Sequence, residues 1–488
     1  MGPYILLVAV LLPLVGGVLL YLLKLKNDRI IQRYTAAVTL VTSVLVWALI
    51  LACGEEGFTF LHLWDGLELK LRFDGMGRFF AGIVATLWPL TILYAFEYMT
   101  REENRGTFFA FFTMSYGVTL GVAMAGNIFT MYCFYELLTL VTMPLVIHTM
   151  EKKAVRAART YLSFSLAGAA FAFVAVVFLA VNGLAGDFVL GGLLSAFDSP
   201  QAARVIYLMG FLGFGVKAAI FPTHVWLPKA AVAPTPVTAL LHAVAVVKSG
   251  AFAIMRLTYF AFGTTLLKGS WVQWVVMGLA MFTIFFGAAK AVKERHFKRR
   301  LAYSTVANLS YILFAVTIMT EGGLAAALLH MAFHAEIKIL AFFAAGAVLH
   351  GTGREYSREL EGLGRRMPLT LGSFTVAALA LVGIPPFSGF VSKWSILTAA
   401  ADSGQPLAYA GAGVVLCAAL MTAVYMLTNV RRIWFPAKGT DLAALDCVHE
   451  VNWKMTVPMI ILAVSILLTG LFAHFVVDAV TAIAAGLS

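Results

Sequence analysis

Hydrophobic residues in this chain fall into long, nearly uninterrupted runs that are separated by short polar segments. A helix of about 20 residues crosses the ~30 Å hydrocarbon core of a bilayer, so each run predicts a membrane-spanning helix. The ~10-residue alternating segments of a membrane β-barrel do not appear. The pattern predicts an all-α polytopic membrane protein with about 14 transmembrane helices. The predicted spans are 4–23, 34–53, 77–97, 107–125, 127–148, 160–182, 204–222, 235–262, 271–289, 301–319, 323–349, 368–401, 408–430 and 456–478.

Composition supports this prediction and excludes other classes of protein. Of the 488 residues, 61% are hydrophobic and only 12% are charged, and the mean hydropathy is +0.90. Soluble domains carry about 25% charged residues, so a soluble globular enzyme and a disordered chain are both excluded. We therefore expect residues 1–488 to form a single membrane domain. A chain with no sizeable soluble segment has no room for a cofactor-binding domain, so no cofactor and no catalytic centre are expected.

The four cysteines are scattered along the chain and show no metal-binding or disulfide spacing. Because iron–sulfur and zinc sites need clustered ligands, we expect no metal site and interpret the cysteines as small apolar fillers. They are Cys53, Cys133, Cys417 and Cys447.

Basic residues are distributed very unequally between the two sides of the predicted bundle. The net charge is +11, with 35 lysines and arginines. Twenty-five of them lie in loops that follow odd-numbered spans, and five lie in the opposite loops. Cytoplasmic loops collect lysine and arginine, so both termini are expected on the outer side of the membrane. This topology explains the positive charge without nucleic acid. We expect a multi-pass protein of a prokaryotic inner (cytoplasmic) membrane, in contact with the lipid bilayer.

Ten charged or histidine residues lie well inside the predicted spans. A charged group at mid-membrane costs ~3 kcal/mol or more, so such residues usually face the protein interior and mark an ion or proton route. A single one could equally be a polar clamp between helices, but ten on several helices favour a route. They are Glu136, Lys217, His242, Lys248, Arg256, His330, His334, Glu336, Lys338 and Lys393.

The spacing of three of these residues favours a proton relay. His330, His334 and Lys338 occur at intervals of four, so they share one face of a helix over ~12 Å. A relay needs donors and acceptors within hydrogen-bond or one-water reach. A buried lysine releases its proton more readily when a nearby carboxylate is withdrawn, so Glu136 and Lys217 are predicted to act as a coupled switch.

Proline-rich interruptions occur in two of the predicted spans. Span 204–222 is followed by the Pro222 and Pro228 region, and span 368–401 contains Pro385 and Pro386. The two broken helices, the seventh and the twelfth, are five spans apart. This spacing predicts two inverted five-helix repeats, at 107–262 and 271–430, because an odd number of spans reverses the second unit. Interrupted helices in inverted repeats are typical of transporters.

At this point the sequence resembles a family: the antiporter-like proton-translocating subunits shared by respiratory complex I, membrane-bound hydrogenases and Mrp-type cation/proton antiporters. The most specific stretch, at 217–256, is KAAIFPTHVWLPKAAVAPTPVTALLHAVAVVKSGAFAIMR. Further matching stretches are FDGMGRFF at 73–80, FYELLTLVTMPLV at 134–146, HMAFHAEIK at 330–338 and GIPPFSGFVSKW at 383–394.

The resemblance implies roles for individual residues. Glu136 and Lys217 match the family's carboxylate–lysine pair. Lys248 matches its central lysine, and His242 the histidine nearby. The residues matching the later part of the family's relay are His334, Lys338 and Lys393, with His330 on the same stripe. Glu336 departs from the family, where many members have an apolar residue, and it lies about 200° around the helix from His334. Lys229 also departs from many complex I members, which makes the hydrogenase and Mrp branches look closer.

These observations predict a proton-translocating subunit of a multi-subunit, complex-I-related assembly such as a membrane-bound hydrogenase or NADH-quinone oxidoreductase. Its expected partners are other membrane subunits and protons, with sodium an open possibility. An alternative is a D-like component of an Mrp-type multi-subunit Na⁺/H⁺ antiporter. A stand-alone solute carrier would instead require a substrate-sized pocket between the repeats, and a purely structural anchor would leave the interior titratable groups unexplained.

Overall fold

The computed structural model describes residues 4–52, 54–55, 57–64, 67–192, 199–439 and 445–487, so Cys53 lies outside the described residues. The α-helices are α1 (Tyr4–Leu23), α2 (Asp28–Ala52), α3 (Gly75–Tyr98), α4 (Arg105–Ala123), α5 (Ile128–Val146), α6 (Lys152–Val181), α7 (Pro200–Gly215), α8 (Trp226–Ala230), α9 (Thr235–Ala243), α10 (Val246–Met255), α11 (Thr264–Leu267), α12 (Trp271–Lys293), α13 (Phe297–Thr317), α14 (Glu321–Thr352), α15 (Pro368–Val382), α16 (Ser388–Asp402), α17 (Pro406–Trp434), α18 (Trp453–Leu471) and α19 (Ala473–Ala484). The 3₁₀ turns are η1 (Met99–Arg101), η2 (Thr223–Val225) and η4 (Leu363–Arg365), and η3 (Arg256–Phe262) is a π-helix.

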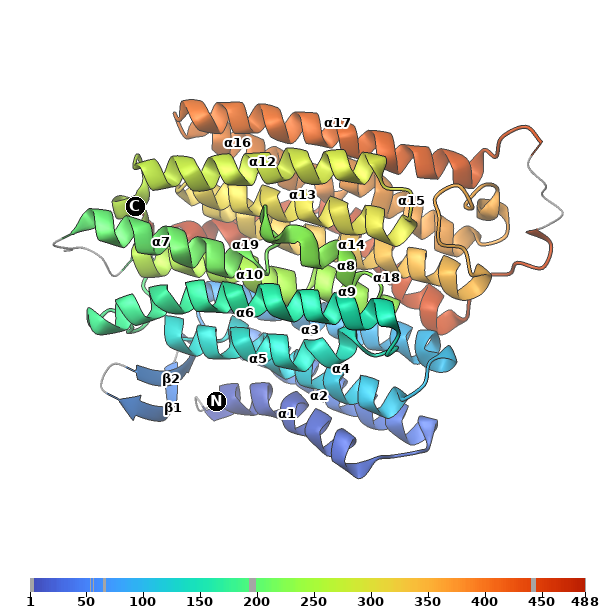
Figure 1. The fold of residues 1–488 in the computed structure, drawn as a ribbon, viewed down its shortest axis with the longest axis horizontal. Coiled ribbons are helices and arrows are strands. Elements are labelled where there is room, and N and C mark those ends of the chain that lie inside the picture. The colour runs from blue at the N-terminus through green and yellow to red at the C-terminus, as the bar shows by residue number, and fades with distance from the viewer. Residues whose placement is uncertain are drawn as a thin grey trace.

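The long helices lie roughly side by side and form one elongated bundle (Figure 1). Within the described part of the chain, eleven helices are long and apolar enough to cross a membrane, which confirms a multi-pass membrane protein. The predicted total of fourteen stays a prediction. Four of the helices outside the eleven cover the remaining predicted spans: α7 with 16 residues, α15 and α16 with 15 each, and α13, which opens with charged residues.

A β-hairpin lies at the end of the bundle where α1 begins and α19 ends (Figure 1). Strands β1 (Gly57–Trp64) and β2 (Leu67–Arg72) pair antiparallel. The all-helical prediction is therefore incomplete. The sequence of β2, LELKLR, alternates apolar and charged residues with the period of a strand. The hairpin is fixed to α5, because the Lys70 N–H donates to Thr130 Oγ1 at 2.8 Å.

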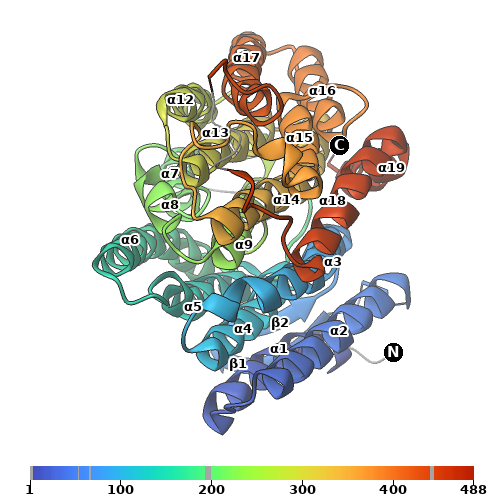
Figure 2. The same cartoon turned by 90° about the vertical axis from the view of Figure 1, so that its right-hand side faces the viewer.

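Helix α14 occupies the centre of the bundle. It packs against α3, α9, α13, α15, α16, α18 and α19, and Figure 2 shows these helices around it. Its 32 residues rise about 48 Å. Thr320 caps its start by accepting from the Gly323 N–H, and Gly353 ends it with φ +72°. His330, His334 and Lys338 of this helix are buried inside the protein, whereas Glu336 is only partly buried.

Three helices are interrupted inside the bundle. Helix α7 ends at Gly215 and residues 216–222 are non-helical, while α15 and α16 are separated by residues 383–387. These two breaks confirm the predicted interruptions. A third break, which the sequence analysis did not predict, separates α9 from α10 at Val244 and Ala245. No proline marks it, so it leaves no clear signal in the sequence.

Candidate functional site

The structure brings Glu136 and Lys217 together at the break after α7. Lys217 Nζ lies 4.0 Å from Glu136 Oε1, donates a hydrogen bond to the Tyr135 carbonyl, and lies 3.4 Å from the centre of the Tyr135 ring. The Lys217 side chain is fully buried, whereas the Glu136 side chain is 22% exposed. The ammonium group is therefore held by a carboxylate, a carbonyl and an aromatic face, each of which favours its charged form.

The unwound segment that carries Lys217 is fixed by two neighbouring helices. Trp226 of α8 donates its indole N–H to the Val216 carbonyl at 2.8 Å. On the other side, a Cβ atom at Gly250 of α10 would overlap the backbone of Lys217 and Ala218. The absence of a side chain at Gly250 thus allows α10 to approach the break closely.

Lys248 lies on α10 and contacts α14 directly. Its Nζ is 2.7 Å from Nδ1 of His334, and both side chains are buried. Lys248 follows the unpredicted break at Val244 and Ala245 by one turn of helix. Among the described residues no hydrogen bond links Lys248 to Lys217, although Gly250 brings the two backbones together.

From His334 the contacts continue along α14 to α16. The His330 and His334 rings stack with their centres 5.7 Å apart. His330 Nδ1 lies 2.9 Å from Ser392 Oγ, and Ser392 precedes Lys393 on α16. The two histidines on α14 therefore contact Lys248 of α10 at one end and Ser392, the neighbour of Lys393 on α16, at the other.

Lys393 of α16 reaches across the break between α15 and α16. Its Nζ donates to the carbonyls of Leu381 at 2.5 Å and Val382 at 3.0 Å. These carbonyls end α15, where the last C=O groups of a helix have no partner within it and carry the negative end of the helix dipole. The Tyr311 ring centre lies 5.6 Å from the ammonium group.

Lys338 and His242 lie beyond this row, around Phe342. Lys338 Nζ donates to the Leu301 carbonyl at 2.9 Å and to Ser304 Oγ, both on α13. It also lies 6.0 Å from the Phe342 ring centre, and the His242 ring packs on the same phenyl ring at 4.9 Å. The structure thus groups these two predicted residues, but His242 makes no hydrogen bond to another predicted site residue within the described ranges.

A polar cavity of about 390 Å³, which no motif in the sequence indicates, lies near the start of α9. Its lining includes Glu102, Glu151 and Glu355, together with Lys298, which donates to the Ala233 carbonyl at 2.9 Å. Burial raises the pKa of Glu102, Glu151 raises it further, and Lys298 lowers it. We call this cavity the vestibule.

The vestibule is connected to Lys338 through α13. Lys298 lies one turn before Leu301 and two turns before Ser304, a rise of about 9 Å in total. Both of these residues bind Lys338. In the sequence Lys298 looks like the other basic residues of the predicted loop before span 301–319, and its burial and its contact with the Ala233 carbonyl distinguish it.

Arg256 belongs to a separate ion pair. Its guanidinium group makes two 2.6 Å hydrogen bonds with the Asp74 carboxylate, which also caps α3 by accepting from the Gly77 N–H. This geometry joins the π-helix η3 to the start of α3. We therefore interpret Arg256 as a structural clamp.

Metal-ligating side chains do not cluster in the described part of the chain. No group of three histidine, cysteine, aspartate or glutamate side chains is placed to hold an ion there. The arrangement as a whole is a group of buried titratable side chains, within which Lys248, His334, His330 and Ser392 make successive contacts by hydrogen bonds and ring stacking.

Comparison with known proteins identifies the family. Residues 125–422 match the model of the "NADH:quinone oxidoreductase/Mrp antiporter, TM" family. The N subunit of the NADH-quinone oxidoreductase of Desulforudis audaxviator is 31% identical over 462 residues, covering 91% of this chain and 90% of that protein. The A/B subunit of a probable K⁺/H⁺ antiporter of Rhizobium meliloti is 31% identical, and the A1 subunit of a Na⁺/H⁺ antiporter of Staphylococcus haemolyticus is 30% identical; each match covers 83% of this chain. The matches span 40% and 53% of these two relatives' lengths.

Two solved structures share the fold over nearly the whole chain. A chain of the membrane-bound sulfane sulfur reductase, an archaeal respiratory membrane complex, superposes with a TM-score of 0.86 at 25% identity, covering 98% of this chain and 97% of that one. A chain of the Mrp complex from Dietzia sp. DQ12-45-1b also gives 0.86, at 23% identity and with 99% and 97% coverage. The chain is therefore an antiporter-like membrane protein that belongs to the NADH:quinone oxidoreductase/Mrp antiporter transmembrane family.

Proposed function

We propose that this chain is a proton-translocating subunit of a multi-subunit membrane assembly related to complex I. One observation carries the proposal: Lys248, His334, His330 and Ser392 are joined by successive contacts that end beside Lys393. A row of titratable groups that crosses from α10 through α14 to α16 is what stepwise proton transfer requires. The relatives named as subunits of antiporters and of a quinone oxidoreductase support an assembly with further membrane subunits.

In the proposed mechanism, a neighbouring subunit perturbs the Glu136–Lys217 pair. When the carboxylate moves away, the buried Lys217 ammonium loses its counter-charge and releases its proton toward Lys248. Moving one charge against roughly 180 mV costs about 4 kcal/mol, at ~2.3 kcal/mol per 100 mV. Removing one partner of a buried ion pair is worth ~3–5 kcal/mol, so one switch of the pair can drive one proton.

We further propose the entrance and exit of the route. The vestibule, with its three carboxylates, supplies protons through Lys298 to Lys338, in addition to refilling near the α7 break. Lys393 releases them on the outer side. This direction assumes that both termini face outward, in agreement with the excess of basic residues on the side of the vestibule.

The two inverted repeats remain part of the proposal. The break after Gly215 lies 108 residues after position 107, and the break at Gly383 lies 112 residues after position 271. The similar position of a break and a lysine in each segment supports two units of the same ancestry, at 107–262 and 271–430.

Replacement of Lys248 tests the relay. In the intact assembly in inverted membrane vesicles, we expect Lys248→Ala to lower proton pumping at least about tenfold, because His334 loses its only lysine contact from α10 and ~1.4 kcal/mol already corresponds to a factor of ten. Lys268→Ala, in an outer loop, is the control and should pump normally. Normal pumping by Lys248→Ala, with the assembly intact, would disprove the relay.

A second candidate function is that of a component of an Mrp-type Na⁺/H⁺ antiporter, which the antiporter relatives favour. Sodium prefers hard oxygen ligands, whereas the interior row consists of lysines and histidines, so this chain would carry protons in that assembly as well. The subunits encoded beside this gene, and sodium flux in vesicles that contain the purified assembly, distinguish the two functions.

A further inference from the structure

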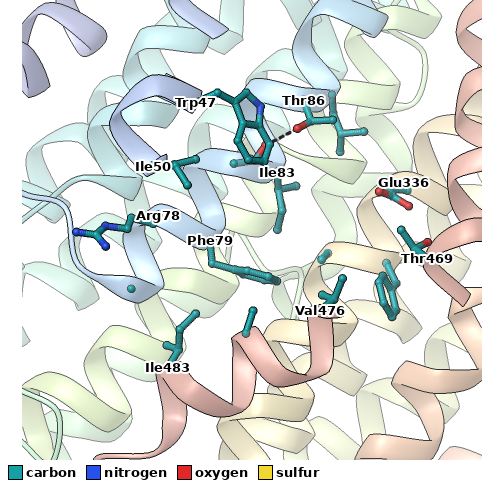
Figure 3. Close-up of a pocket in the computed structure, with 16 residues that line it drawn as sticks. Trp47, Ile50, Arg78, Phe79, Ile83, Thr86, Glu336, Thr469, Val476 and Ile483 are labelled. Carbon is teal, nitrogen blue, oxygen red and sulfur yellow. Dashed lines mark hydrogen bonds between the residues drawn. The ribbon is translucent and has the colours of Figure 1, made fainter. Parts of the chain in front are cut away.

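An apolar groove opens on the side of the bundle away from the proposed relay. Helices α3 and α14 form its floor, and α2 and the α18–α19 pair stand on either side of it (Figure 2). The groove encloses about 440 Å³. Figure 3 shows its lining, which is mostly hydrophobic and includes Trp47, Phe79, Ile83 and Val476. We call it the Glu336 groove, after the carboxylate at its inner end.

Glu336 is an unusual residue to find there. It lies 15 residues after the start of α14 and 16 before its end, and thus at the middle of this membrane-spanning helix. Ser465 Oγ donates to Glu336 Oε1 at 3.4 Å. The other oxygen, Oε2, is buried and has no hydrogen-bond partner among the described residues. A polar atom left in this state costs several kcal/mol in hydrocarbon, so a donor from a neighbouring molecule would stabilise this carboxylate.

The depth of Glu336 restricts what the occupant can be. The groove follows α3 from Gly75 to Leu87, which is about 18 Å along the helix. Figure 3 shows Glu336 and Thr469 at the end opposite Arg78. A lipid has its polar groups at the membrane surface and offers only hydrocarbon at this depth. A transmembrane helix can present a polar or charged side chain at any depth.

The floor of the groove also suits a helix. Small residues line it on three of its helices, namely Gly75 and Gly82 on α3, Ala332 on α14 and Ala479 on α19. Small residues at membrane helix interfaces allow backbones to approach closely, which replaces the missing hydrophobic driving force with packing and hydrogen bonds.

We propose that the Glu336 groove is the docking site for a transmembrane helix of a neighbouring subunit, and that this helix carries a lysine, arginine or histidine that pairs with Glu336. The charge complementarity selects this occupant, because a basic side chain satisfies the buried carboxylate in a medium where neither charge is stable alone. The proposal requires that the chain works in an assembly, but it does not depend on the proton relay.

The docked helix would also contact α14 and α18, which pack against the break that holds Lys393. Helix α18, which contacts Glu336 through Ser465, packs Gly470 directly against the backbone of Pro386 and Ser388 in the α15–α16 break. Helix α14 carries Glu336 on one side and His334 on the other. A shift of the partner helix therefore reaches the exit end of the row through two rigid helices.

Photocrosslinking in the purified, intact assembly tests this docking site. Trp47→p-benzoylphenylalanine replaces one large aromatic side chain of the groove by a larger photoreactive one, and Phe79→p-benzoylphenylalanine is a second probe in case the first variant does not assemble. Trp274, which is 58% exposed on α12, gives the matched control outside the groove. We expect one adduct from the groove, to a peptide of a co-purified subunit whose membrane helix contains a basic residue, and lipid adducts from Trp274.

Two further variants define the chemistry. Glu336→Leu should reduce the yield of the groove adduct at least about tenfold, because the basic side chain loses its counter-charge. Thr86→Val, in the same groove, should leave the yield unchanged. Lys248→Ala should also retain the adduct, so a failed relay and a failed docking site give different results. Only lipid adducts from both groove probes, or a protein adduct that Glu336→Leu does not weaken, would overturn the proposal.

Discussion

The two predicted helix breaks hold their lysines in different ways. At the first break Lys217 lies 4.0 Å from a carboxylate and against the face of a tyrosine ring. At the second break Lys393 has no carboxylate partner among the described residues and donates to two carbonyls at the end of α15. The first lysine is balanced by a full opposite charge. The second is balanced by the partial charge of a helix end, equivalent to about half an elementary charge.

This difference suggests that the two lysines have different roles in the proposed route. A full counter-charge that can move is an effective switch, because its removal changes the free energy of the lysine ammonium by several kcal/mol. Backbone carbonyls cannot move away unless the helix end unfolds. They therefore stabilise the Lys393 ammonium group only moderately, and by a constant amount. The Glu136–Lys217 pair is therefore suited to receive a signal, and Lys393 to release a proton.

The largest effect is expected from removal of the moving charge. Glu136→Gln leaves Lys217 buried without a counter-ion, and the loss of one partner of a buried pair costs at least ~3 kcal/mol. We expect proton pumping in vesicles to fall about 100-fold, since 1.4 kcal/mol corresponds to a factor of ten.

The control for this change is Glu102→Gln, which removes one of three vestibule carboxylates and should lower pumping only slightly. If Glu136→Gln and Glu102→Gln are equally mild while the assembly stays intact, the two breaks do not differ in the way that their geometry indicates.

A smaller effect is expected at the second break. Lys393→Met removes the ammonium group and leaves the Leu381 and Val382 carbonyls without their donor, a loss of about 1–3 kcal/mol. Pumping should fall about tenfold, and the purified assembly should unfold at a lower temperature. Lys393→Arg, which keeps a cation near the end of α15, should recover part of the pumping activity and part of the thermal stability. If the assembly with Lys393→Met pumps less than the assembly with Glu136→Gln, the proposed roles of the two lysines are wrong.

The sequence predicted the row better than its surroundings. The intervals of four between His330, His334 and Lys338 fix one helix face, and proline and glycine mark both predicted breaks, because these signals are local. The partners of Lys393 were not predictable, since backbone carbonyls belong to every residue and only the path of the chain at the break exposes them. The interruption at Val244 and the position of Lys298 at the vestibule were not predicted for a similar reason. Long-range packing determines both, and no local residue pattern indicates them.

The smallest effect should come from the single hydroxyl that joins the row to the second break. Ser392→Ala removes the 2.9 Å contact with His330, and a neutral hydrogen bond contributes about 1 kcal/mol, so pumping should fall about fivefold. Ser388→Ala is the matched control on the same helix, because the Ser388 hydroxyl is buried and has no hydrogen-bond partner among the described residues. It should pump normally. Equal activity of the two variants would show that protons reach Lys393 without the Ser392 hydroxyl, and the contact between His330 and Ser392 would then not be the link between the row and the second break.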